Sequence, residues 1–122
     1  MLSWQQIREM SQNNITFGAH TMTHPILSTM PIKDAKQEIC NSKYLIEEKL
    51  GQKIKHFAFP NGGLSDFTPE LESYCKEIGF ESVSTAIYGS NRVNSDVYAL
   101  KRISPGKNMP IFAVDLVRSF LK

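Results

Sequence analysis

The stretch that decides the fold is residues 15–25, Ile-Thr-Phe-Gly-Ala-His-Thr-Met-Thr-His-Pro. Its first five residues are mostly apolar and β-prone, and they stop at His20, which predicts a short buried strand over 15–19. A polar turn follows from His20 to Pro31 and contains two prolines, which punctuate regular structure. We therefore expect a buried strand that delivers His20 and His24 into a loop at its carboxyl end.

Helical patterns lie on both sides of this stretch. Helices are predicted over about 3–13, about 33–50, 68–79 and about 110–122. Ser3 and Gln6 have the spacing of a capping box at the start of the first helix. Gly51 suits the C-terminal stop of the second helix, and Thr68 with Pro69 suits the start of the third.

Further strands alternate with these helices. They are predicted over 54–59, 81–85 and 98–104. Such alternation favours parallel crossover connections, so the sequence predicts an α/β sheet or barrel. In these folds ligands bind at loops that follow the carboxyl ends of strands, and the loops after His20 and after Phe59 are both expected there.

The composition narrows the class of protein. With 122 residues, 41% hydrophobic and 21% charged, the chain suits one modest globular domain. A net charge of +2 without a block of lysine and arginine argues against a nucleic-acid partner. No apolar run approaches the roughly 18 residues that span a bilayer, and the N-terminus has no signal-peptide pattern. Cys40 and Cys75 each fall in a helical pattern, which favours two free thiols and leaves a disulfide open.

The clearest chemical feature is the pair His20 and His24. Two neutral imidazoles four residues apart can share one metal ion if a tight loop brings them together, because imidazole nitrogen is a preferred zinc ligand. The hydroxyls of Thr21 and Thr23 could orient the ring nitrogens. The pair can equally be polar decoration that caps a turn, and by itself it does not decide between these two interpretations.

Residues 17–25 resemble the second signature of the polysaccharide deacetylases (carbohydrate esterase family 4), in which a strand delivers two histidines that bind a divalent metal. Residues 57–62, Phe-Ala-Phe-Pro-Asn-Gly, resemble the third signature of that family, and residues 100–103 match a late strand more weakly. The resemblance implies that His20 and His24 bind a divalent metal, zinc being the expected one. It also implies a partial, distorted (β/α) barrel, with residues 1–122 as the C-terminal portion of a single domain.

The same resemblance assigns one wall of the substrate groove. The groove residues that it implies are Phe59, Pro60, Asn61 and Gly62. Phe59 could stack on a sugar ring, although core packing is the alternative. Asp66 could reach a substrate hydroxyl, although a loop-capping role is the commoner one for aspartate.

Several departures from the family pattern limit the expected activity. The first signature, a strand that ends in Asp-Asp and supplies the general base and the third metal ligand, does not occur in the 122 residues. Ala58 stands where many relatives have arginine, and Asn61 where tyrosine is usual. The late histidine that acts as general acid is absent too, since His56 comes too early and is interpreted as a surface or strand-edge residue. Because amide hydrolysis at a metal needs both a base and an acid, we expect the isolated chain to be inactive, with its catalytic residues unknown.

Three functional hypotheses remain. The resemblance implies a metal-dependent hydrolase that removes N-acetyl (or O-acetyl) groups from an acetylated polysaccharide or oligosaccharide at the bacterial cell envelope or outside the cell. The second hypothesis is a non-catalytic descendant that binds a glycan or a partner through the same groove. The third is a domain of another class in which the two histidines only cap a turn. Because the opening strands of the barrel are missing, we also expect an exposed strand edge and either a homodimer that covers it or poor solubility.

Overall fold

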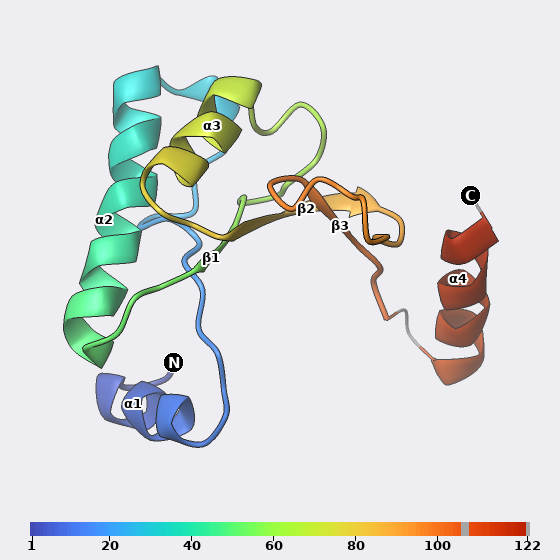
Figure 1. Cartoon of the computed structure of the whole chain (residues 1–122), viewed down its shortest axis with the longest axis horizontal. Helices are drawn as coiled ribbons and strands as arrows, with labels where there is room; N and C mark the ends of the chain where they lie inside the picture. The colour runs from blue at the N-terminus through green and yellow to red at the C-terminus, as the bar shows by residue number, and fades with distance from the viewer. Residues whose placement is uncertain (106–107, 122) are drawn as a thin grey trace.

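The computed structural model describes residues 1–105 and 108–121 (Figure 1). Its elements are α1 (Trp4–Gln12), the 3-10 helix η1 (Leu27–Thr29), α2 (Ile32–Leu50), β1 (His56–Ala58), α3 (Pro69–Glu77), β2 (Ser82–Tyr88), β3 (Leu100–Arg102) and α4 (Met109–Leu121). All four predicted helices and the last three predicted strands are therefore confirmed. Within the described ranges, no helix has both the length and the apolar character needed to cross a membrane.

The three strands form one parallel sheet in the order β1-β2-β3. β1 pairs with the first half of β2, and His56 lies opposite Ser82 in that register. β2 continues to Tyr88, which lies opposite Arg102 of β3, so it ends three residues beyond the predicted strand over 81–85. Parallel strands with a helix between β1 and β2 confirm the predicted α/β class, and their carboxyl ends share one edge of the sheet.

The strand predicted over residues 15–19 is wrong in its extent. Only Ala19 joins the sheet, through a single parallel bridge to Phe57. The Ala19 N–H donates to the His56 oxygen at 2.9 Å, and the Ala58 N–H donates to the Ala19 oxygen at 3.0 Å. The neighbouring strand β1 is only three residues long, so a longer ladder has no partner to pair with. The sequence located the point where the chain enters the sheet but overestimated the length of regular structure.

A compact apolar core lies between the sheet and the helices α2 and α3, which run beside each other (Figure 1). Its members are Ala19, Leu27, Ala35, Ile39, Ile54, Phe57, Phe59, Phe67, Leu71, Cys75, Phe80 and Val83. Ala35 and Ile39 lie four residues apart on one face of α2, and both are fully inaccessible to solvent. Both cysteines are free thiols, as favoured above, with Cys75 buried in α3 and Cys40 half-buried in α2.

The predicted helix-end residues act as expected. Ser3 and Gln6 form the reciprocal capping box, with the Gln6 N–H donating to Ser3 Oγ at 3.2 Å and the Ser3 N–H to Gln6 Oε1 at 2.8 Å. Gly51 ends α2 in the left-handed conformation at φ 68°. Thr68 Oγ1 accepts from the Leu71 N–H at 3.3 Å at the start of α3. Local sequence therefore fixes these boundaries with little help from packing.

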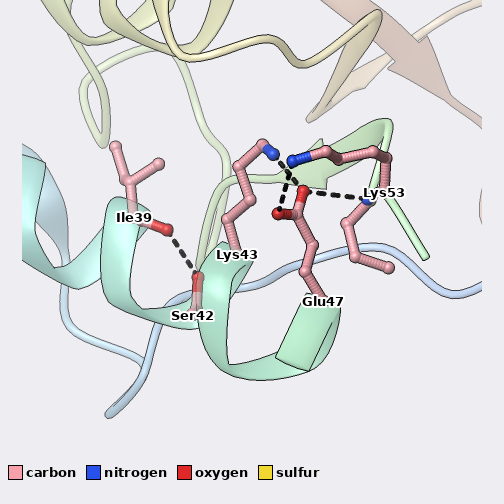
Figure 2. Close-up of polar contacts among 6 residues, drawn as sticks. Ile39, Ser42, Lys43, Glu47 and Lys53 are labelled. Carbon is pink, nitrogen blue, oxygen red and sulfur yellow. Dashed lines mark hydrogen bonds and ion pairs between the residues drawn. The ribbon is translucent and has the colours of Figure 1, made fainter. Parts of the chain in front are cut away.

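A buried ion pair fixes the passage from α2 into β1 (Figure 2). Lys43 is only 4% exposed, and its ammonium group donates to Glu47 Oε1. The same carboxylate oxygen accepts from the Ile54 N–H at 3.1 Å, and the exposed Lys53 lies 3.7 Å from Glu47 Oε2. Burial by itself raises the pKa of Glu47, but the hydrogen bonds and the two lysine charges outweigh burial and lower it. Glu47 thus connects the end of α2 to the segment that leads into β1.

The last helix, α4, lies away from the core, beyond β3 (Figure 1). One hydrogen bond that joins it to the preceding chain runs from Ser90 Oγ to the Ser119 oxygen at 2.8 Å. Large apolar side chains on α4 remain exposed, among them Met109 at 72% and Val117 at 60%. The residues that the structure describes therefore leave part of the apolar surface of this helix exposed.

Candidate metal and substrate site

The structure brings His20 and His24 together. Their ring centroids are 4.8 Å apart, and the ring planes meet at 69°. Both side chains are exposed, and both belong to the loop that follows Ala19 beside the carboxyl end of β1. The two imidazoles therefore form one accessible cluster at the sheet edge where parallel α/β folds bind ligands.

One hydrogen bond determines which nitrogen of His20 is available. His20 Nδ1 lies 2.7 Å from the carbonyl oxygen of Ala58, the last residue of β1. A carbonyl oxygen can only accept, so Nδ1 must carry the proton and donate it. The lone pair of a neutral ring then resides on Nε2, which is the nitrogen left to bind a metal.

The predicted role of the two threonines is corrected. Thr21 Oγ1 donates to the His20 carbonyl oxygen at 2.5 Å and accepts from the His24 N–H at 3.1 Å. Thr21 and His24 both adopt positive φ, at 68° and 60°, which is uncommon for residues other than glycine. The hydroxyl of Thr21 thus closes a tight backbone turn, and it is the Ala58 carbonyl that orients the His20 ring. The sequence pattern did not reveal this because the carbonyl belongs to a distant strand.

Glu38 of α2 contacts the loop between the histidines, a contact that the sequence analysis missed. Its Oε2 accepts from the Met22 N–H at 2.8 Å and the Thr23 N–H at 3.0 Å, and its Oε1 accepts from the Thr23 hydroxyl at 2.7 Å. Burial by itself raises the pKa of Glu38, but these hydrogen bonds outweigh burial and lower it. An anionic carboxylate therefore binds the loop between the two histidines. No periodicity or motif links residues 16 positions apart, so only the packing of α2 beside the loop reveals the contact.

Two of the four residues assigned to the substrate groove have buried side chains. Phe59 is fully buried, and its ring stacks on Phe67 with centroids 4.5 Å apart and an interplanar angle of 6°. Pro60 is also fully buried. Neither side chain can present a face to a sugar in this structure, so core packing, the alternative for Phe59, is confirmed. The aromatic character of this strand end serves the hydrophobic core.

The remaining groove residues shape the backbone. Asn61 is exposed at φ 58°, and Gly62 is buried at φ 77°. Asparagine tolerates the left-handed conformation better than bulky residues, which gives a physical reason for asparagine at this position. A Cβ atom on Gly62 would lie 2.7 Å from the Ala86 nitrogen, whose N–H donates to the Gly62 oxygen at 2.8 Å. Glycine is therefore required where this loop approaches β2.

A second set of contacts joins the two loops that resemble family signatures. Ser28, which follows the histidine loop, donates from Oγ to the Ser65 oxygen at 2.6 Å and from its N–H to the Asp66 oxygen at 3.3 Å. The Asp66 carboxylate accepts from the Gly63 N–H at 2.8 Å. The loop-capping interpretation of Asp66 is therefore confirmed. These contacts hold the Pro-Asn-Gly-Gly loop against the segment that carries the histidines.

His56 lies at the other end of β1, and its Nδ1 is 2.7 Å from Ser82 Oγ of β2. It is exposed at the first residue of the strand, which confirms its interpretation as a strand-edge residue. Across residues 1–105 and 108–121, no group of three histidine, cysteine, aspartate or glutamate side chains is arranged to hold a metal ion. His20 and His24 therefore offer two imidazole nitrogens close together, without a third such side chain beside them among the described residues.

A pocket of about 380 Å³ lies at the carboxyl ends of β2 and β3. It is lined by Ala86, Tyr88, Arg102, Ile103, Ser104 and Pro105. The Arg102 Nε donates to the Thr85 oxygen at 2.6 Å, and this bond holds the arginine side chain against β2. Because the strands are parallel, this polar and aromatic pocket opens at the same edge of the sheet as the histidine pair.

A family model described as polysaccharide deacetylase matches residues 2–83, about two thirds of the chain. The chain belongs to the polysaccharide deacetylase family. This confirms the resemblance, and the matched range contains His20, His24 and the whole Pro-Asn-Gly-Gly loop. All the residues that line the pocket at the ends of β2 and β3 lie beyond the matched range.

Individual relatives agree with the family assignment. The chain is 26% identical over 113 residues to YxkH of Bacillus subtilis (strain 168), whose name places it among the polysaccharide deacetylases. Its fold is similar to that of the Streptococcus pyogenes deacetylase PplD, solved in complex with acetate, with a TM-score of 0.80 and 22% identity over 97% of this chain. It is also similar to IcaB from Ammonifex degensii, with a TM-score of 0.74 and 25% identity over 95% of this chain. The expected fold, part of a (β/α) barrel of the deacetylase kind, is confirmed.

The chain spans half or less of most of these relatives. It covers 39% of YxkH, 50% of the PplD chain and 54% of the IcaB chain. The remainder of each relative has no counterpart among the 122 residues.

Proposed function

We propose that this chain carries the histidine half of a metal-dependent active site that removes N-acetyl (or O-acetyl) groups from a polysaccharide. The observation that carries the proposal is the pair of exposed imidazoles 4.8 Å apart, one of which has its Nδ1 proton committed to the Ala58 oxygen. The family supports a hydrolase that acts on acetyl amide or ester groups. The acetate held by PplD, the acyl product expected of such a hydrolysis, supports the same chemistry.

His20 and His24 would hold the metal, and zinc is the ion that best suits imidazole donors in a hydrolase. When bound, such an ion polarises the acetyl carbonyl and lowers the pKa of a water molecule. The chain's own residues contribute positioning: Ala58 fixes the His20 tautomer, and Thr21 closes the turn between the histidines. We propose that the third ligand, the general base and the general acid come from outside these 122 residues, and that the isolated chain is inactive.

The substrate class follows from the same family. An acetylated polysaccharide or oligosaccharide would lie along the sheet edge, over the histidine pair and toward the pocket that contains Tyr88 and Arg102. Aromatic and polar side chains of this kind suit a sugar ring and its hydroxyl groups. Such polymers belong to the cell envelope or the exterior of a bacterium, which is where we place the protein.

A second candidate is a non-catalytic descendant that binds a glycan through this edge. Ala58 and Asn61 favour it, because they stand where the family pattern has arginine and tyrosine. The two candidates differ in one respect: the first needs His20 and His24 for metal binding, whereas glycan binding by the second does not need a metal.

Self-association is a further part of the proposal. Met109, Ile111, Val114 and Val117 are exposed on α4, and β3 has no neighbour on its outer side among the residues described. Apolar surfaces and open sheet edges favour contact between copies of a chain. We therefore propose a homodimer that covers them, which light scattering at increasing concentration would detect. A monodisperse monomer at high concentration would contradict it.

Zinc titration followed by NMR tests the metal site. We expect zinc to perturb the ring resonances of His20 and His24 and to leave those of His56 unchanged. His24→Ala should abolish the effect on His20, whereas His56→Ala, a histidine at the opposite end of β1, should not alter it. Zinc binding that survives both His20→Ala and His24→Ala would contradict the proposed site. Zinc-dependent acetate release from acetylated chito-oligomers by the pure chain would contradict the proposed inactivity.

A further inference from the structure

We propose that Glu38 is the positioning residue of the metal-binding loop, holding His20 and His24 in the arrangement that lets them share one ion. The inference rests on the proposed function for its consequence, metal affinity, but not for its geometry. Glu38 lies outside the two segments that resemble family signatures, and the groups that donate to it belong to Met22 and Thr23 rather than to the histidines. It acts through the backbone of the residues between them.

The loop needs an external constraint because its conformation is unfavourable by itself. Thr21 and His24 both have positive φ, and such residues persist only when their surroundings impose the conformation. Within the loop, the Thr21 hydroxyl supplies the closing hydrogen bond to the His24 N–H. The Met22 and Thr23 N–H groups donate to Glu38.

The geometry of the contact suits an anionic clamp. Two adjacent N–H groups converge on Oε2, and the Thr23 hydroxyl donates to Oε1, so both carboxylate oxygens accept from the loop. A carboxylate has only acceptors, and hydrogen bonds to an ionised acceptor are stronger than those to a neutral one. Alanine at position 38 would remove all three bonds at once.

The clamp is anchored on a helix that packs into the buried core. Ala35 and Ile39, on either side of Glu38 in α2, are fully buried in the core. Their packing fixes the helix backbone from which the Glu38 side chain extends. The loop begins after Ala19, which joins the sheet through a single bridge. Glu38 therefore connects a segment that has little regular structure to a helix that is held in place by the core.

Amide hydrogen exchange and ring-to-ring NOEs measured by NMR test the clamp without any metal. In Glu38→Ala we expect the Met22 and Thr23 amides to exchange about ten-fold faster or more, as loss of charge-assisted bonds implies. The His20–His24 ring NOE should weaken, while amides of β1 remain protected. Glu38→Gln, whose amide oxygen can still accept the two N–H groups, should restore most of the protection. Glu48→Ala is the matched control, since Glu48 is an exposed glutamate on the same helix.

Zinc affinity of the same variants gives the functional consequence. Glu38→Ala should weaken zinc binding by about 10- to 100-fold, the usual effect of losing a group that orients metal ligands. Unchanged exchange at Met22 and Thr23 together with an intact ring NOE would overturn the inference. Faster exchange in Glu38→Ala would uphold it even if the unmodified chain bound no zinc, and that result would count against the proposed function alone.

Discussion

Replacing Glu47 by alanine should destabilise the protein by about 3–5 kcal/mol, the usual cost of breaking a buried ion pair. The change removes the partner of Lys43, which is only 4% exposed and lies 5.7 Å from the Phe80 ring centroid. The ammonium group would be left without its carboxylate in a largely apolar setting. The Ile54 N–H, which donates to Glu47 at 3.1 Å, would also lose its acceptor.

The magnitude follows from the burial of both groups. The side chains of Lys43 and Glu47 are 5% and 10% exposed, so water can replace little of the lost interaction. The orphaned Ile54 N–H alone would cost about 1–3 kcal/mol, part of which is contained in the total. Urea unfolding followed by circular dichroism measures the difference, with the slope of the transition checked for constancy.

Two further variants test whether the loss of stability comes from leaving a buried charge unpaired or from the loss of a charge as such. Lys53→Ala should change stability by less than about 1 kcal/mol, because Lys53 is 81% exposed and its ion pair is screened by water. The double variant Lys43→Met with Glu47→Leu should recover most of the loss, since it leaves no buried charge unpaired. A loss below about 1 kcal/mol for Glu47→Ala would refute the reasoning, because it would show that Lys43 reaches water readily once the carboxylate is gone.

Three further predictions concern backbone, pH and thiol chemistry. Gly62→Ala should cost about 1–3 kcal/mol in thermal or urea unfolding, because it adds a Cβ atom 2.7 Å from a backbone nitrogen at φ 77°; Gly51→Ala, at φ 68° in open space, should cost less. Because the folded chain lowers the pKa of Glu47 below its ordinary 4.5, the stability from this group should be complete above about pH 4.5 and lost as the pH falls through the lower folded value. Glu47→Gln should flatten that acid dependence of the urea midpoint, and an unchanged slope would contradict the assignment. Burial raises the pKa of the Cys75 thiol to about 12, so iodoacetamide at pH 8 should label Cys40 first by mass spectrometry, and preferential labelling of Cys75 in the folded chain would contradict its burial.

Features governed by neighbouring residues were predictable from the sequence. The capping box at Ser3, the left-handed stop at Gly51 and the Thr68 cap all depend on contacts within one turn of the chain, and all three are present. The parallel α/β class followed from the alternation of helices and strands, because crossover connections impose it. The two histidines were found because four residues and a tight loop suffice to bring them together.

Features that depend on segments far apart in the chain were decided only by the tertiary structure. Residues 15–19 have the composition of a strand, but strand length is set by a neighbour, and β1 offers only three residues. Phe59 is an aromatic residue of the kind that stacks on sugars, yet its ring stacks on Phe67 and packs in the core. The partners that orient the site, the Ala58 carbonyl and the Glu38 carboxylate, lie 38 and 16 residues from the groups they bind. Sequence identifies which side chains are candidates to bind a metal, whereas long-range packing determines which ring nitrogen is left available for binding. The physical reason is that hydrogen bonds between distant segments form only once the core has brought those segments together.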